Sequence, residues 1–234
     1  MRFPGVACRC GVPDLAASAM GIVHGFCYQL SKSLARAALD HQVVGREHLF
    51  EDGPALICSN HVSFLDPPLV GTSFDKPIYY LARKSLYSNP FARWLFPKLN
   101  VVPVDQDRAG FAGLKTAIRM LQDGKRVIIF PEGSRSPDGQ LQAAQPGPGL
   151  VVAKARVPVI PVRIFGAYEA LPYGSMKFRT STVTVVAGPV LRFDREPLPD
   201  TKEGYLAISE RIMAAIAEIR CPEDRIPKPR KERG

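Results

Sequence analysis

The chain has 234 residues, of which 46% are hydrophobic and 23% are charged, and its formal net charge at pH 7 is +9. This length and composition are typical of a folded protein with one core, and the surplus of cations favours an anionic partner. No base-stacking aromatic motif accompanies the positive charge, so the sequence argues against a nucleic-acid partner.

Cysteine usage indicates a reducing compartment. The chain has an odd number of cysteines, and no two of them have C-x-x-C spacing: Cys8, Cys10, Cys27, Cys58 and Cys221. This pattern predicts neither a disulfide framework nor a zinc site, and we expect no metal. A cytosol-facing protein is the natural expectation.

The first element is a predicted helix over residues 14–38, after an irregular segment at residues 1–13. Its apolar residues recur at four-residue steps: Ile22, Phe26, Leu30, Leu34 and Ala38. This face is explained either by packing against the core or a partner, or by lying in a membrane interface. The longest apolar stretch, residues 15–30, contains polar groups and is too short to predict a transmembrane helix.

Strands then alternate with helices along most of the chain. Runs rich in Val and Ile predict strands at residues 43–46, 55–59, 78–82, 101–104, 126–130, 158–165 and 182–187. Helical patterns lie at residues 69–74, 90–98, 111–123, 150–155 and 201–219. We therefore predict a single α/β layered domain at residues 41–220, with a largely parallel mixed sheet flanked by helices. An N-terminal amphipathic helix within residues 1–40 precedes it, and a basic, disordered tail at residues 221–234 follows it.

The junction after the predicted strand at residues 55–59 contains a candidate acid/base pair. His61 lies on the predicted loop, and Asp66 follows five residues later at the start of a helix. A histidine can take a proton from a hydroxyl at neutral pH, and a carboxylate can orient the ring and stabilise the imidazolium. A structural interpretation is also available, because Asp before Pro67 is a good helix cap and His61 could be an ordinary loop histidine.

Three stretches, in order along the chain, resemble the signature blocks of the glycerolipid acyltransferase family. They are N-H-x-x-x-x-D at residues 60–66, F-P-E-G-S-R-S at residues 130–136 and V-P-V-I-P-V at residues 157–162. A fourth block, at residues 99–108, resembles the family's pattern less closely. There Asn100 replaces a glycine, and two residues separate Asp105 from Arg108. The resemblance extends from about residue 40 to about residue 195.

The resemblance implies roles for individual residues. His61 is the expected general base and Asp66 its orienting partner, while Glu132, Gly133, Ser134, Arg135, Arg108 and Lys84 are expected to bind substrate. Arg135 suits a phosphate because a guanidinium holds one in a bidentate way. Glu132 either accepts a hydrogen bond from an acceptor hydroxyl or anchors its loop.

The activity implied by the resemblance is transfer of a fatty acyl group from acyl-CoA or acyl carrier protein to lysophosphatidic acid, giving phosphatidic acid. No cofactor is implied beyond the acyl donor. The expected partners are membrane lipids, and the expected location is the cytoplasmic face of the cell membrane, as a peripheral protein. Other acceptors remain open, namely glycerol-3-phosphate, acyl-ornithine or another lysolipid, as does a non-catalytic lipid-binding protein of the same fold.

Overall fold

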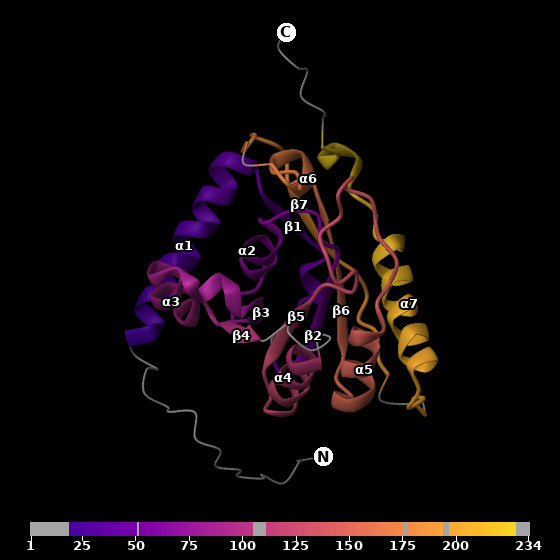
Figure 1. The fold of residues 1–234 in the computed structure, drawn as a ribbon. Helices are drawn as coiled ribbons and strands as arrows, with labels where there is room; N and C mark the ends of the chain where they lie inside the picture. Colours follow the sequence, from indigo (N-terminus) through magenta and orange to yellow (C-terminus); the bar gives the residue numbers. More distant parts are fainter. Residues whose placement is uncertain (1–18, 51, 105–110, 176, 194–196, 228–234) are drawn as a thin grey trace.

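The computed structural model describes residues 19–50, 52–104, 111–175, 177–193 and 197–227. Within these residues a central sheet is covered by helices on both faces (Figure 1). The helices are α1 (Ala19–Leu39), α2 (Asp66–Gly71), α3 (Pro90–Leu95), α4 (Phe111–Gln122), α5 (Pro146–Ala155), α6 (Ala167–Ala170) and α7 (Lys202–Glu218). Short 3-10 helices lie at Arg46–His48, Lys84–Ser88, Phe96–Leu99 and Glu223–Arg225.

The described strands form one sheet in the order β1-β7-β6-β2-β5-β3-β4. They are β1 (Gln42–Val44), β2 (Ala55–Ser59), β3 (Tyr79–Arg83), β4 (Val101–Val104), β5 (Arg126–Ile129), β6 (Val159–Phe165) and β7 (Thr184–Ala187). The five strands from β6 to β4 run parallel, whereas β7 is antiparallel to β6 and β1 is parallel to β7. The predicted α/β fold with a largely parallel mixed sheet is therefore confirmed.

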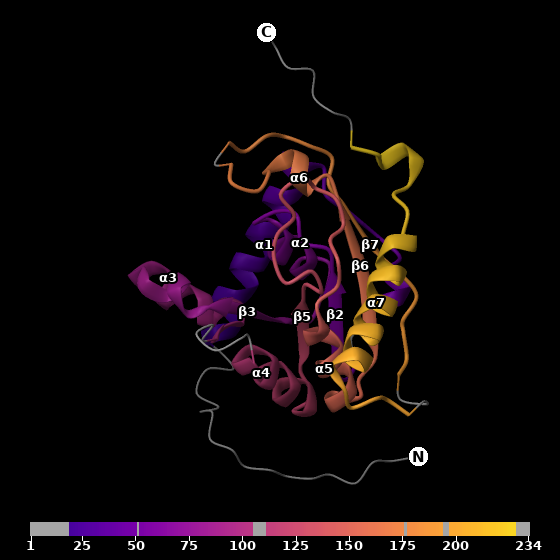
Figure 2. The ribbon, with the colours of Figure 1, turned by 45° about the vertical axis from the view of Figure 1, so that its right-hand side comes forward.

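Each face of the sheet has its own core. On one face, buried residues of α1, α2 and α6 pack against the sheet, including Leu39 and Val70. On the other face, α4, α5 and α7 contribute residues such as Leu121 and Ile212. Figure 2 shows α7 and α1 on opposite sides of the strands. Every residue of β2 is buried, as expected for a parallel strand covered on both faces.

Helix α1 contacts the domain through one side only. Ala35 and Leu39 are buried, and the Tyr28 hydroxyl donates to the Phe74 carbonyl oxygen at 2.7 Å. Three side chains of the predicted apolar face are not buried, because Phe26, Leu30 and Leu34 are 68%, 47% and 57% exposed. Packing of these three side chains against the core is thus the wrong alternative. Among the described residues, no helix is both long and apolar enough to cross a membrane.

Two boundary predictions are corrected by long-range contacts. Helix α5 begins at Pro146, four residues before the predicted start, because proline is well suited to the first helical turn. Here the backbone approaches α7 closely, since a Cβ on Gly149 would lie 1.8 Å from the Tyr205 carbonyl oxygen. The tail prediction is wrong for residues 222–227, where Arg225 is buried and contacts Asp40 at 2.6 Å. Residues 228–234 and 1–18 lie outside the described part of the chain.

Candidate active site

The candidate site lies where the parallel strands end. The loop at residues 60–65 follows β2, and the loop that begins at Phe130 follows β5. Because β2 and β5 are paired neighbours, both loops leave the same edge of the sheet. In open α/β sheets, this carboxyl edge is where ligands bind.

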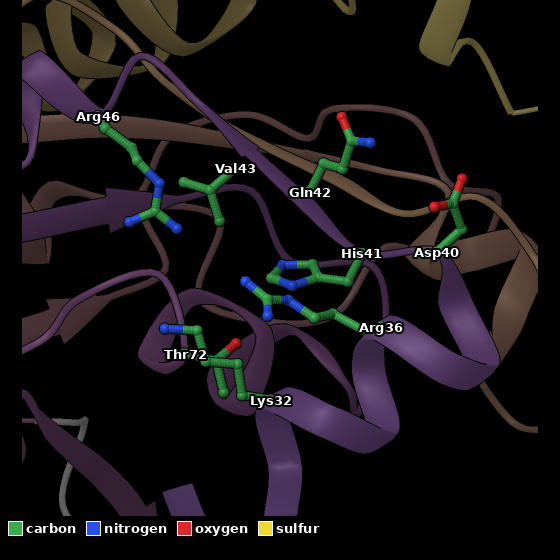
Figure 3. A pocket seen from close by; sticks show the side chains of 8 residues that line it. All are labelled: Lys32, Arg36, Asp40, His41, Gln42, Val43, Arg46 and Thr72. Carbon is green, nitrogen blue, oxygen red and sulfur yellow. The ribbon is translucent and has the colours of Figure 1, made fainter. Parts of the chain in front are cut away.

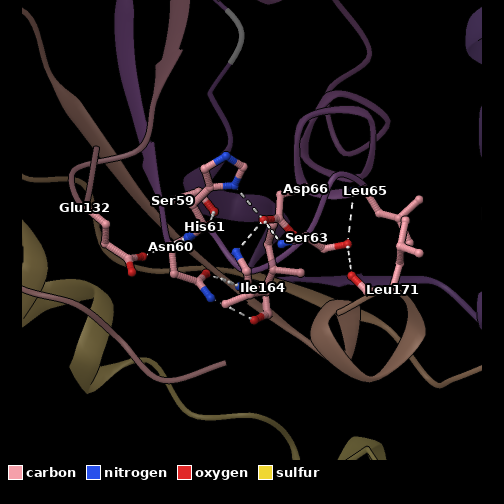
Figure 4. Close-up of polar contacts among 10 residues, drawn as sticks. Ser59, Asn60, His61, Ser63, Leu65, Asp66, Glu132, Ile164 and Leu171 are labelled. Atoms are coloured by element: carbon pink, nitrogen blue, oxygen red, sulfur yellow. Dashed lines mark hydrogen bonds and ion pairs between the residues drawn. The ribbon is translucent and has the colours of Figure 1, made fainter. Parts of the chain in front are cut away.

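The predicted contact between His61 and Asp66 is present. The Nδ1 atom of His61 lies 2.8 Å from Oδ2 of Asp66, as Figure 4 shows. The same oxygen accepts the backbone N–H groups of Val62 at 2.6 Å and Ser63 at 2.7 Å. Asp66 therefore shapes the loop and holds the ring at the same time. The helix-cap interpretation is wrong, because Asp66 is the first residue of α2, whose N-cap is Leu65, and no side chain caps the helix. Its complete burial raises the pKa of the Asp66 carboxyl, while the hydrogen bonds to His61 and the two amides oppose that shift.

The imidazole of His61 is fixed on a second side by an aromatic ring. It stacks on Phe130, with the ring centroids 3.9 Å apart and the planes at 16°. Because Nδ1 faces Asp66, the other ring nitrogen, Nε2, points away from the carboxylate (Figure 4). The side chain keeps 18% of its surface exposed, so the ring is held firmly but remains accessible. This orientation leaves Nε2 available to accept a proton.

The backbone of His61 is bound on both sides by the second loop. Its N–H donates to Oε1 of Glu132 at 2.8 Å, and its carbonyl oxygen accepts the Ser136 N–H at 2.7 Å. The other oxygen of Glu132 accepts the Gln142 N–H at 3.0 Å. Two roles were expected for Glu132, a contact with an acceptor hydroxyl or anchoring of its loop, and these hydrogen bonds are of the anchoring kind. Burial raises the pKa of this carboxyl to about 6.

Asn60 anchors the loop to the opposite neighbour of β2. Its side-chain nitrogen donates to the Ile164 carbonyl oxygen at 3.1 Å, and its side-chain oxygen accepts the Ile164 N–H at 2.7 Å. Asn60 therefore holds the start of the His61 loop against β6. Sequence reasoning did not find the supporting roles of Phe130, Ser136 and Ile164, because their partners lie far away along the chain.

Arg135 lies between two aromatic rings. Its guanidinium carbon is 3.5 Å from the ring centre of Phe64, on the His61 loop, and 4.8 Å from that of Tyr173. One guanidinium nitrogen, Nη1, is buried and has no hydrogen-bond partner among the described residues. A stacked, desolvated guanidinium with an unused donor is well suited to an oxyanion. Gly133 has a φ of +74°, which is the left-handed conformation that favours glycine, and Ser134 beside it is exposed.

The other basic candidates differ in what the structure shows of them. Lys84 begins the 3-10 helix directly after β3, at the carboxyl edge of the sheet, and is exposed. Its contact with a phosphate stays a prediction. Arg108 lies outside the described residues. Arg163, another basic residue, lies on β6 and is bound elsewhere, because its Nη1 donates to the carbonyl oxygens of Ala217 and Ile219 at the end of α7.

Comparison with known proteins identifies the family to which the chain belongs. A family model described as Acyltransferase matches residues 40–165. The 1-acyl-sn-glycerol-3-phosphate acyltransferase of Bacillus subtilis is 27% identical over 207 residues, covering 87% of this chain and 100% of that protein. The chloroplastic 1-acyl-sn-glycerol-3-phosphate acyltransferase LPAT1 of Arabidopsis thaliana is 34% identical over 136 residues, or 57% of this chain. The match spans 38% of the Arabidopsis protein's length.

A solved structure is similar over most of both chains. The crystal structure of PlsC, the 1-acyl-sn-glycerophosphate (LPA) acyltransferase of Thermotoga maritima, superposes with a TM-score of 0.72 at 26% identity. The superposition covers 89% of this chain and 86% of that chain.

Proposed function

Because the chain belongs to the acyltransferase family, we propose that it transfers a fatty acyl group from a thioester to the free hydroxyl of lysophosphatidic acid, giving phosphatidic acid. The donor is acyl-CoA or acyl carrier protein. The observation that carries the proposal is the 2.8 Å contact between His61 and Asp66, with Nε2 of the ring left accessible. The reaction uses no metal and no cofactor besides the donor.

In the proposed reaction, the acceptor oxygen attacks the carbonyl carbon of the thioester while Nε2 of His61 takes the hydroxyl proton. The new ester C–O bond forms, the C–S bond breaks, and the proton passes from His61 to the leaving thiolate. Asp66 stabilises the imidazolium that exists between these steps. General base catalysis of this kind typically contributes 10²–10⁴-fold to the rate.

Arg135 is the proposed binding residue for the acceptor's phosphate. Its buried Nη1 lacks a partner among the described residues, and Phe64 brings the guanidinium beside the loop of His61. Gly133 and Ser134 place backbone and a hydroxyl next to the same phosphate, and Lys84 and Arg108 are further proposed cationic contacts. Glu132 supports the site by holding the His61 backbone.

We also propose that the protein works at the cytoplasmic face of the cell membrane as a peripheral protein. The exposed side chains Phe26, Leu30 and Leu34 of α1 support this proposal. Helix α1 contacts the 3-10 helix that follows α3, and α3 exposes Phe91 and Trp94. These five side chains supply an apolar surface of the kind that enters lipid.

The decisive test is release of free thiol from a long-chain acyl-CoA by the purified protein, with and without lysophosphatidic acid. We expect release that depends on the acceptor and that is lost in His61→Ala. Release without an acceptor would instead identify a thioesterase. Release only with glycerol-3-phosphate, an acyl-ornithine or another lysolipid would change the acceptor. No release with either donor class, across all acceptors, would favour a lipid-binding protein.

A further inference from the structure

A second basic site lies outside the candidate active site. Between α1, the start of β1 and the end of α2 there is a pocket of about 490 Å³, within the range of small-ligand sites. The described residues that line it are Lys32, Arg36, Asp40, His41, Gln42, Val43, Arg46 and Thr72. None of them belongs to the His61 loop or to the loop of Arg135. We call this the α1 pocket.

The local fold places His41 inside this pocket. Helix α1 ends with Asp40 in the left-handed conformation, at a φ of +41°, and the His41 N–H then donates back to the Ala35 carbonyl oxygen. This hydrogen bond and the left-handed Asp40 together reverse the chain direction at the end of the helix. It turns His41 inward, so the residue is only 7% exposed.

His41 has an unused polar atom in these surroundings. Its Nε2 is buried and has no hydrogen-bond partner among the described residues. Buried polar atoms of native proteins are seldom left unpaired, so an orphan nitrogen that lines a pocket indicates a missing ligand atom. The lowered pKa of His41, about 4, follows from burial and from the nearby cations Arg36, Arg46, Arg225 and Lys32.

The charges around the pocket are not balanced. No hydrogen bond or ion pair with another described residue involves the side chain of Arg36 or Arg46. Asp40 is the one carboxylate among the described lining residues, and it is paired with Arg225 at 2.6 Å. Lys32 has a distant ion pair with Asp75, at 3.8 Å. Figure 3 shows the side chains of Arg36 and Arg46 extending toward the region of the His41 ring.

We propose that the α1 pocket binds a phosphate group, held by the Arg36 and Arg46 guanidinium groups and by Nε2 of His41. Guanidinium groups and a ring N–H are donors, and phosphate oxygens are acceptors, so the ligand would satisfy the orphan atom and the unbalanced charge together. The phosphate belongs either to an anionic lipid headgroup or to a soluble phosphate compound. The site does not require acyl transfer, so it stands independently of the proposed function.

The first arm of the test uses inorganic phosphate and observes the histidine ring signals of the full chain by nuclear magnetic resonance. A chloride titration at matched ionic strength is the reference. The His41 signals are assigned as those that disappear in His41→Gln. We expect their chemical shifts to change with increasing phosphate concentration until the site is saturated. In the double variant Arg36→Gln/Arg46→Gln the change should be far smaller. Both arginines are exposed, so this variant should fold. A shift at His61 alone would report phosphate at the candidate active site.

The second arm uses flotation with vesicles of phosphatidylcholine, with and without 20% phosphatidic acid. If the phosphate belongs to a lipid, the pocket variant should lose roughly 10- to 30-fold in affinity for the anionic vesicles, since each basic residue near such a surface contributes about fivefold. The matched control is Arg119→Gln/Arg192→Gln, which removes the same charge from exposed positions elsewhere.

The two arms together decide the proposal. A response of His41 to inorganic phosphate without any pocket-dependent vesicle binding supports a soluble ligand. Pocket-dependent binding of anionic vesicles supports a lipid headgroup. An unmoved His41 signal, together with equal vesicle affinity of the pocket and control variants, would overturn the phosphate site, whatever the thiol-release assay shows.

Discussion

His61 and His41 are the same side chain in opposite surroundings. His61 has a carboxylate oxygen 2.8 Å from Nδ1, whereas His41 lies among four cations and has an unpartnered Nε2. The carboxylate orients the His61 ring so that Nε2 points away from it, whereas burial and the nearby cations lower the pKa of His41. The first ring is therefore held in a fixed orientation with one nitrogen accessible, and the second is equipped to remain neutral and offer hydrogen bonds. The neighbours of each ring, more than the ring itself, define its role.

Removing the proton acceptor tests the first half of this contrast and should have the largest effect. We expect His61→Ala to lower acceptor-dependent thiol release by about 10²–10⁴-fold, because the hydroxyl proton then has no base. The matched control is His48→Ala, outside the site, which should retain activity. Circular dichroism should show both variants folded. Undiminished turnover in His61→Ala would end the general-base assignment.

Titration of the second histidine should produce a stability effect of about 3 kcal/mol. The unfolded chain binds this proton near pH 6.5, and folded His41 binds it near pH 4, so the unfolded state binds more protons between these values. The free energy of unfolding should therefore fall as the pH falls from 6.5 to 4, by about 1.4 kcal/mol per pH unit for this group.

Thermal or denaturant unfolding across this pH range measures the effect. His41→Gln should show a flatter dependence of stability on pH, because the glutamine cannot take up the proton. His48→Gln removes another histidine and serves as the control. Parallel curves for the wild type and His41→Gln would mean that His41 does not resist protonation.

Arg135, the cation beside the His61 loop, provides a further test of how the surroundings of the two histidines differ. Arg135→Ala should raise the acceptor KM by about 10- to 100-fold, since hydrogen bonds to charged groups contribute about 1.5–3 kcal/mol. The acyl-CoA KM should change little. Arg119→Ala, on the exposed side of α4, is the control. An unchanged acceptor KM would remove Arg135 from the phosphate site.

The smallest expected effect concerns the exposed face of the helix that leads to His41. Phe26→Ser should change the free energy of unfolding by less than about 0.5 kcal/mol, because the ring is 68% exposed. The same change should weaken binding to neutral vesicles, whereas Ala37→Ser, also exposed, should leave it unaltered. Equal vesicle binding of both variants would contradict a membrane role for this face.

Local patterns predicted the parts of the site whose partners are near in sequence. His61 and Asp66 are five residues apart, so the strand-to-helix junction suggested their contact, and the resemblance of the later blocks decided in favour of the dyad over a structural interpretation. Alternating helix and strand patterns likewise predicted the α/β sheet, and every described strand overlaps a predicted one. The catalytic and binding roles, the domain limits and the membrane location stay predictions.

The missed features depend on residues that only the fold brings together. Glu132 reaches the His61 backbone because β2 and β5 pair, which no local pattern shows. The early start of α5 was hidden by a Pro and Gly-rich sequence that is typical of loops but here permits close packing on α7. Arg225 resembles a residue of a charged tail, yet it pairs with Asp40 from 185 positions away.

The bonds that hold the His61 loop also set an order of assembly. His61 is held by Glu132, 71 residues later, and Asn60 by Ile164, 104 residues later. As the ribosome delivers the chain from its N-terminus, the histidine and aspartate emerge long before the segments that fix them. Contacts this distant in sequence form late and slowly. A nascent chain that stops before β6 would thus contain both dyad residues without a fixed loop, and the complete site would appear only with nearly the whole domain.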